Sequence, residues 1–235
     1  MSKRTWIIFV VVVIGLLSAL VISARIANPP IDVSAVDPAV IQSASDANGQ
    51  IADHVFGKAD SKVILMEYGD FQCPGCGSAH PRIKAITEQY QNELAFVYRN
   101  FPLTSIHPNA KAAAAAAEGA GLQGKYWEMH DIVFENQRNW ESQSGNARTD
   151  IFIGYARDLG LDITKFSADL NAESINQKIS FDQAIAKKVG VESTPTFYLN
   201  GVLLGSDIWG DDAKLKAAID TELTKAGVPL PGSTE

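Results

Sequence analysis

Residues 63–80 read VILMEYGDFQCPGCGSAH, and this stretch decides the fold. Its first six residues have the apolar and β-branched content of a buried strand, interrupted by the single acid Glu67. Gly69 then turns the chain. A helix is expected to begin at Cys73, because Pro74 suits the first helical position and small or apolar residues recur after it. The stretch therefore predicts a strand, a turn and a helix that starts at a cysteine.

The residues that follow continue this α/β pattern. Residues 94–101 (LAFVYRNF) predict a second strand, so that strand, helix and strand follow at the spacing of a parallel crossover unit. A helical pattern covers 108–136 and includes six alanines at 112–117, which we interpret as a tightly packed helix. Two more helices are expected over 149–159 and 175–189. Together these helices predict a helical insertion after the second strand.

The C-terminal part predicts a hairpin and one last helix. Two short strands, 196–200 and 202–204, are joined at Asn200-Gly201, which is a strong hairpin signal. A final helix is expected over 211–226. The whole chain has 235 residues, and after its first fifty or so are set aside the rest has the length of one domain.

The N-terminal segment predicts a membrane anchor. Residues 6–23 read WIIFVVVVIGLLSALVIS, an uncharged run long enough, at about 1.5 Å per residue, to cross the hydrocarbon core. Lys3 and Arg4 precede it, which favours a cytoplasmic N-terminus and an extracytoplasmic domain. The alternative is a cleaved signal peptide, but the best cut, after Ala24, has Ile22 where a small residue is preferred. We therefore favour an uncleaved anchor.

Composition excludes several function classes. The net charge of -7 argues against the basic surface that nucleic acids and anionic lipids require. The only cysteines, Cys73 and Cys76, cannot complete a tetrahedral zinc site by themselves, and no second pair shows zinc-finger spacing, so no metal site is expected. His80 is interpreted as a packing or surface histidine, and His107 and His130 as structural.

The two cysteines carry the chemistry that we expect. With Cys73 at the N-cap and Pro74 and Gly75 in the first turn, the sulfur faces free N–H groups and the positive end of the helix dipole. Both lower a thiol pKa, so Cys73 is expected to attack and Cys76 to resolve the mixed disulfide. The alternative, a passive staple, is disfavoured because so short a loop constrains the unfolded chain by only roughly 2 kcal/mol.

Three features together resemble one known family. Residues 71–76 (FQCPGC) follow a strand, residues 194–196 (TPT) precede a hairpin, and a long helical insertion separates them, as in DsbA-like thioredoxin-fold proteins. Residues 100–137, NFPLTSIHPNAKAAAAAAEGAGLQGKYWEMHDIVFENQ, are similar to the insertion segment of that group's membrane-anchored or secreted members. The resemblance extends over nearly all of residues 53–227. It implies a thioredoxin fold with an inserted helical subdomain, preceded by one transmembrane helix.

The resemblance also implies roles for individual residues. Cys73 corresponds to the nucleophile and Cys76 to the resolving cysteine. Pro195 matches the proline whose peptide bond is cis beside the disulfide, and Thr194 would offer backbone groups to the substrate chain. Glu67 resembles the buried acid beneath the active site. No cofactor is implied.

Physical chemistry supports the role of Glu67. An acid inside an apolar strand costs several kcal/mol if it is charged and unpaired, so Glu67 should hold a proton near neutrality and could relay it to Cys76. The alternative is a carboxylate at a strand end that reaches solvent. The chain departs from the best-known DsbA pattern at Gly75, where that branch has a histidine, and this departure bears on oxidising strength.

These inferences combine into one expected organisation. We expect a cytoplasmic tip and anchor over residues 1–25, an extracytoplasmic linker over 26–52 and a thioredoxin-like domain over 53–228. The helical insertion is expected at about 105–190, and a C-terminal tail at 229–235. The linker is predicted from its prolines and its small, polar residues.

The expected function is a dithiol oxidase that introduces disulfides into reduced exported proteins. By family analogy, a membrane quinone-linked thiol oxidase, DsbB-like or similar to vitamin K epoxide reductase, would reoxidise it. One alternative is a disulfide reductase or isomerase with the same site. The other is a binding module or holdase that needs no redox cycling.

Overall fold

The computed structural model describes residues 2–27 and 31–232, and it divides into two compact units, Met1–Asp32 and Val33–Glu235. The first unit contains α1 (Lys3–Ala27), a helix of 25 residues. Its rise of about 1.5 Å per residue, together with its apolar composition, makes it long enough to cross a membrane. The predicted span therefore forms one helix.

The second unit holds five strands and the remaining helices of the described residues. The strands are β1 (Val55–Gly57), β2 (Ile64–Gly69), β3 (Ala95–Asn100), β4 (Thr196–Leu199) and β5 (Val202–Leu203). The helices are a short 3-10 turn, η1 (Asp46–Asn48), and α2 (Pro74–Gln89), α3 (Ala110–Gly121), α4 (Tyr126–Glu135), α5 (Gln137–Trp140), α6 (Gly145–Asp158), α7 (Ile163–Asp169), α8 (Glu173–Lys188), α9 (Ser206–Trp209) and α10 (Asp212–Lys225).

The strands form one mixed sheet in the order β1-β3-β2-β4-β5. β2 and β3 are parallel, and α2 connects them, which confirms the expected crossover unit. β4 runs antiparallel to β2 and continues through the hairpin into β5. β2 is thus the central strand, and its C-terminal end leads directly to the cysteines.

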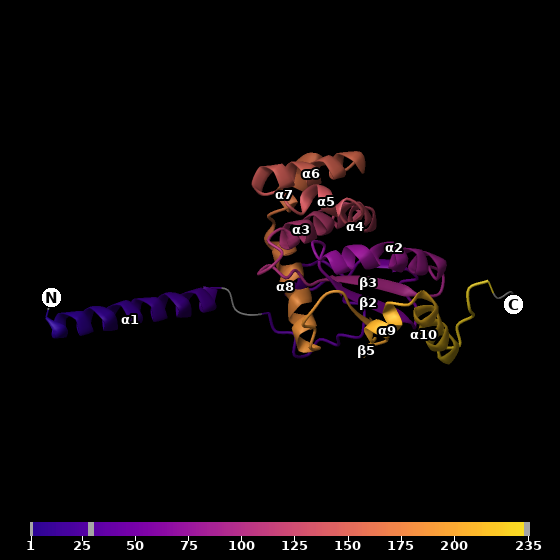
Figure 1. The fold of residues 1–235 in the computed structure, drawn as a ribbon, viewed down its shortest axis with the longest axis horizontal. Coiled ribbons are helices and arrows are strands. Elements are labelled where there is room, and N and C mark those ends of the chain that lie inside the picture. Colours follow the sequence, from indigo (N-terminus) through magenta and orange to yellow (C-terminus); the bar gives the residue numbers. More distant parts are fainter. Residues whose placement is uncertain (1, 28–30, 233–235) are drawn as a thin grey trace. The chain divides into compact units, whose positions relative to one another are not determined.

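Helices cover both faces of the sheet. Apolar side chains of α2 and α10 pack with those of β2, β3 and β4 in one core cluster, so these two helices share a face. α8 contacts β3 and α3, and the other core cluster includes residues from α3, α4, α6, α7 and α8. Figure 1 shows α3 to α7 gathered beside the sheet layer as a helical subdomain. Five alanines at 113–117 are buried in it, which confirms the packed alanine helix.

Some elements differ from the sequence expectation. The helical pattern expected over 108–136 forms two helices, α3 and α4, because Gly124 between them has a φ of 75°, which an α-helix cannot contain. β1, α5, α7 and α9 were not expected, and each spans seven residues or fewer. Periodicity has too few repeats in such short elements to be recognised.

The stretch expected as a linker, residues 26–52, is bound to the domain over part of its length. Arg99 of β3 is fully buried and donates hydrogen bonds to the carbonyl oxygens of Pro38 and Val40, at 2.8 and 2.7 Å. It also pairs with the Asp53 carboxylate at 2.8 Å. A buried guanidinium needs acceptors for its five donors, and backbone carbonyls of the expected linker supply two. The compact unit accordingly begins at Val33, well before residue 53.

Candidate active site

The two cysteines lie at the start of α2, as the sequence predicts. Cys73 is the N-cap residue, and Pro74 occupies the first helical position. Both thiols are free; the side chain of Cys73 is 8% exposed and that of Cys76 is 1% exposed. The Cys73 thiol donates to the carbonyl oxygen of Thr194 at 3.4 Å and accepts no capping hydrogen bond from the helix in this protonated state.

The surroundings shift the two thiol pKa values in opposite directions. The pKa of Cys73 is lowered to about 5, first by the hydrogen bond from the Cys76 thiol, although burial opposes this shift. The Thr194 side chain and the backbone N–H groups of Cys76 and Gly75 lower the pKa of Cys73 further, because all of them donate to the thiolate. Burial raises the pKa of Cys76 well above its usual value, and its bond to Cys73 adds to this. At neutral pH, Cys73 is therefore a thiolate and Cys76 a thiol.

The Thr194-Pro195 segment, more than a hundred residues along the chain, lies against the cysteines. Its peptide bond is cis. A Cβ placed on Gly75 would lie 3.3 Å from Cδ of Pro195 and 3.5 Å from Sγ of Cys73, so the three residues are in close contact. The hydroxyl of Thr194 is buried and makes no hydrogen bond within the described residues. The Thr194 hydroxyl is therefore free to donate a hydrogen bond to Sγ of Cys73.

Glu67 lies inside the sheet beneath the cysteines. It is in β2, opposite Tyr98 of β3 and Phe197 of β4, and only 4% of its surface is exposed. Burial, and then the charge of Cys73, raise the pKa of Glu67 to about 8. The alternative of a carboxylate that reaches solvent at a strand end does not fit this position. Glu67 in turn raises the pKa of Cys76.

The helical insertion contributes residues that sequence reasoning missed. Nε2 of Gln137, at the start of α5, donates to the carbonyl oxygens of Phe71 and Cys73 at 2.7 and 3.0 Å. Nε2 of Gln72 donates to the carbonyl oxygen of Glu141 at 2.8 Å. These bonds tie the loop before α2 to the insertion. No sequence signal could have identified Gln137, because it lies more than sixty residues from its partners.

A family model described as thioredoxin matches residues 50–221, which is most of the chain and includes every site residue above. The chain belongs to the thioredoxin family. Its expected fold, a thioredoxin fold with a helical insertion, is confirmed by this match and by the mixed sheet.

Solved structures of thioredoxin-like proteins have the same fold as this thioredoxin-family chain. A thioredoxin-like oxidoreductase from Silicibacter pomeroyi DSS-3 is 27% identical with a TM-score of 0.60, over 76% of this chain and 94% of that one. BdbD from Bacillus subtilis is 22% identical with a TM-score of 0.65, over 79% and 98%. Alpha-DsbA1 from Wolbachia pipientis is 23% identical with a TM-score of 0.64, over 74% and 92%. The last two, at this identity, show the fold alone.

Curated proteins that are similar in sequence to this thioredoxin-family chain are named as Na(+)/H(+) antiporters. The Na(+)/H(+) antiporter NhaA 1 of Salinispora arenicola is 40% identical over 149 residues, which are 63% of this chain and 22% of that protein. The antiporter NhaA of Herminiimonas arsenicoxydans is 35% identical over 149 residues, with the same shares. The chain spans about a fifth of the length of these relatives, so the match gives no evidence that this chain has their transport activity.

One cluster in this thioredoxin-family domain has the donor types of a metal site. Ligand atoms of His80, His130 and Asp131 lie within 4.8 Å of one another. Nδ1 of His130 lies 3.0 Å from Oδ1 of Asp131, which is a hydrogen-bond distance, and Nε2 of His80 lies 3.8 Å from the same oxygen. Nζ of Lys84 lies 2.7 Å from Asp131, so a cation already pairs with that carboxylate. The cluster fits a hydrogen-bonded group better than a metal centre.

Proposed function

We propose that this chain is an extracytoplasmic thiol-disulfide oxidoreductase that acts through Cys73 and Cys76. The observation that carries the proposal is the contrast between the two thiols: Cys73 has a pKa lowered to about 5, whereas the pKa of Cys76 is raised. Only a thiolate attacks or leaves readily in disulfide exchange, and the cysteine that meets the substrate must be the anion. A structural staple would need no such contrast.

The exchange would proceed in two steps. A substrate thiolate attacks Sγ of Cys73 in the disulfide form, the bond between the two sulfurs breaks, and Cys76 leaves with the electron pair. Cys76 then takes a proton, which Glu67 holds near neutrality because its pKa is about 8. A second substrate thiolate attacks the substrate sulfur of the mixed disulfide and releases Cys73 as a thiolate. Two electrons pass from the substrate to the cysteine pair.

Thr194, Pro195 and a polar surface pocket would receive the substrate chain. The Thr194-Pro195 segment borders Cys73, and its backbone would offer hydrogen-bonding groups to an extended peptide. The pocket, of about 470 Å³, lies beside Pro74 and is lined by residues of α2 and of the α4–α5 region, among them Gly77, Gln137 and Arg138.

The pKa of Cys73 supports the oxidase direction. At pH 7 a thiol of pKa about 5 stabilises the reduced protein by about 3 kcal/mol relative to an ordinary thiol, which corresponds to about 60 mV. A stabilised reduced form makes the disulfide form more oxidising. The best-known DsbA pattern has a histidine at the position of Gly75, and glycine supplies no charge that would stabilise the thiolate. A reductase or isomerase is therefore the second candidate.

Location and partners complete the proposal. The apolar helix α1 would anchor the chain, with the domain outside the cytoplasm, in a compartment where disulfides persist. Residues 1–25 would form the tip and anchor, and the domain would act on reduced exported proteins. A quinone-linked membrane thiol oxidase, DsbB-like or similar to vitamin K epoxide reductase, would return the cysteine pair to the disulfide.

The redox potential tests whether the chain acts as an oxidase or a reductase, and replacement of the two cysteines tests whether it is an enzyme or a binding module. Equilibration with glutathione buffers should give a potential well above that of thioredoxin, about -270 mV; a value at or below it would rule out the oxidase. The double variant Cys73→Ser, Cys76→Ser should lose all oxidative refolding of a reduced substrate protein. If it keeps full activity, the domain is a binding module or holdase.

A further inference from the structure

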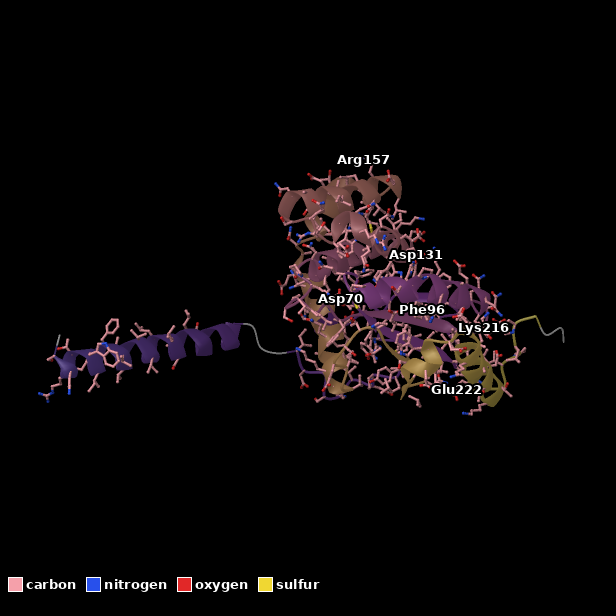
Figure 2. All side chains as sticks on the ribbon, in the orientation of Figure 1. Asp70, Phe96, Asp131, Arg157, Lys216 and Glu222 are labelled. Atoms are coloured by element: carbon pink, nitrogen blue, oxygen red, sulfur yellow. The ribbon has the colours of Figure 1, made fainter. Side chains whose placement is uncertain are left out.

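A small cavity lies beneath the active site, between α2, α4 and the sheet. It holds about 20 Å³ and is lined by Glu67 of β2, His80 of α2 and His130 of α4, among others. Phe96 and Asp131, both labelled in Figure 2, line it from β3 and α4. A cavity needs about 10–15 Å³ to hold a water molecule, so this one has room for about one.

Polar atoms of the lining residues have no partners in the described part of the chain. Nε2 of His80, Nε2 of His130 and Nε1 of Trp127 are buried there without a hydrogen bond. The raised pKa of Glu67 has burial and the charge of Cys73 as its causes, and among the described residues none is a cause through a hydrogen bond to its carboxyl group. Buried polar groups in proteins are nearly always satisfied, by water where protein does not suffice. A water in this cavity accounts for these atoms together.

The cavity connects Glu67 to the surface. Nε2 of His80 lies 3.8 Å from Oδ1 of Asp131, and Oδ2 of Asp131 lies 2.7 Å from Nζ of Lys84. The side chains of Asp131 and Lys84 are 24% and 34% exposed. The charged or titratable groups that face His80 are therefore Lys84 on its own helix, His130 and Asp131 on α4, and Glu67 across the cavity.

We propose that His80, with one water in this cavity, carries protons between Glu67 and solvent each time Cys76 gains or loses a proton. The proposal rests on the thiol-disulfide exchange proposed above. When Cys76 leaves with the electron pair of the disulfide, it takes the proton of Glu67. Solvent then protonates the neutral His80 ring at Nε2, beside Asp131, and the imidazolium passes this proton through the water to Glu67, which leaves His80 neutral again. The one proton consumed comes from solvent.

The state of His80 suits this transfer. Burial, and then the neighbouring His130, lower the pKa of His80 to about 4, so the ring is neutral at physiological pH, with one donor and one acceptor nitrogen. Nδ1 of His130 is already hydrogen-bonded to Asp131 at 3.0 Å. Nε2 of His80 is free to bond the water.

The variants that test this role keep the packing as far as the chain allows. His80→Phe retains a ring that can stack on Phe134, now 5.0 Å away, but cannot carry a proton. His80→Gln is a second, polar variant. Thr87→Val is the matched control, because Thr87 lines the same cavity and its replacement has nearly the same shape. Circular dichroism melts establish that each variant is folded.

The assay is a single turnover of the disulfide form with a cysteine-containing peptide at pH 7, quenched with acid and analysed by mass. His80→Phe and His80→Gln should react about a hundredfold more slowly, at the lower end of what positioned proton transfer contributes, and Thr87→Val at the wild-type rate. The glutathione potential should not change, since a relay alters the rate and not the end states. In the Glu67→Gln background, His80→Phe should cause no further slowing.

The outcomes separate this proposal from the proposed function. Wild-type rates in both His80 variants, an equal slowing in the Glu67→Gln background, or a shifted potential would each overturn the relay. If neither His80 variant folds, the wild-type rate in mixtures of H₂O and D₂O decides: a curved dependence supports transfer of several protons, and a straight line refutes it. If the wild-type protein does not react with the peptide at all, the proposed function itself fails.

Discussion

Replacing Thr194 by valine would remove one hydroxyl donor beside Cys73 while keeping the shape of the side chain. The hydroxyl has no hydrogen-bond partner within the described residues while Cys73 is protonated, so valine breaks no bond in that state. In the thiolate state the Thr194 side chain is among the groups that lower the pKa of Cys73. The substitution therefore acts on the thiolate alone.

The size of the effect follows from one charge-assisted hydrogen bond. Such a bond contributes about 1.5 kcal/mol, which is about one pKa unit. The pKa of Cys73, now about 5, should rise to roughly 6 in Thr194→Val. Because Cys73 stays ionised at pH 7 in both proteins, the reduced form should lose the same free energy. The redox potential should then fall by about 30 mV.

Two measurements check this prediction. Thiolate absorbance or iodoacetamide reactivity against pH gives the pKa of Cys73, and glutathione equilibration gives the potential. Thr196→Val is the matched control, because the hydroxyl it removes donates to the carbonyl oxygen of Ser193 at 2.7 Å. Its pKa and potential should match the wild type. A wild-type pKa in Thr194→Val would show that the hydroxyl does not reach the sulfur and would refute the reasoning.

Other buried groups give three further predictions. The pKa of Glu67 in the folded protein is raised to about 8, so the stability that the protonated acid contributes is full below about pH 4.3 and is lost as the pH rises to 8. Urea unfolding of the wild type should therefore show a loss of about 4 kcal/mol in the free energy of unfolding between pH 5 and 8, and Glu67→Gln should not show it. Arg99→Leu removes one of the two cations that pair with the buried Asp53 carboxylate, the other being Lys178, and should lower the free energy of unfolding by about 3 kcal/mol. Gly69→Ala places a Cβ 2.3 Å from the buried Tyr98 ring and should cost about 2 kcal/mol in thermal unfolding.

Matched controls separate these effects from general mutational loss. Glu88→Gln makes the same substitution at an exposed carboxylate and controls for the exchange of a carboxyl group for an amide. Lys225→Ala breaks an exposed pair with Glu222 and should change stability by less than about 0.5 kcal/mol. Gly154→Ala, in α6, meets nothing within 4 Å and should be neutral or slightly stabilising. If a control loses as much stability as its partner variant, the stated cause is wrong.

The local elements of the active site could be predicted from the sequence. The strand, turn and helix of residues 63–80, the cysteines at the helix start and the hairpin at Asn200 each depend on neighbours within a few residues. Helix capping, the position of Pro74 and the apolar pattern act over that same range. The membrane-spanning length of α1 is likewise a property of a continuous segment.

The tertiary structure alone decided what surrounds the sulfur and the acid. Thr194 lies against Cys73, and Gln137 holds the loop before α2, although both come from distant segments. The same holds for the cavity between Glu67 and His80, and for the backbone carbonyls of residues 38 and 40 that Arg99 binds. A pKa depends on burial and on every charge and donor nearby, and folding brings those groups together from segments whose local sequence carries no sign of their partners.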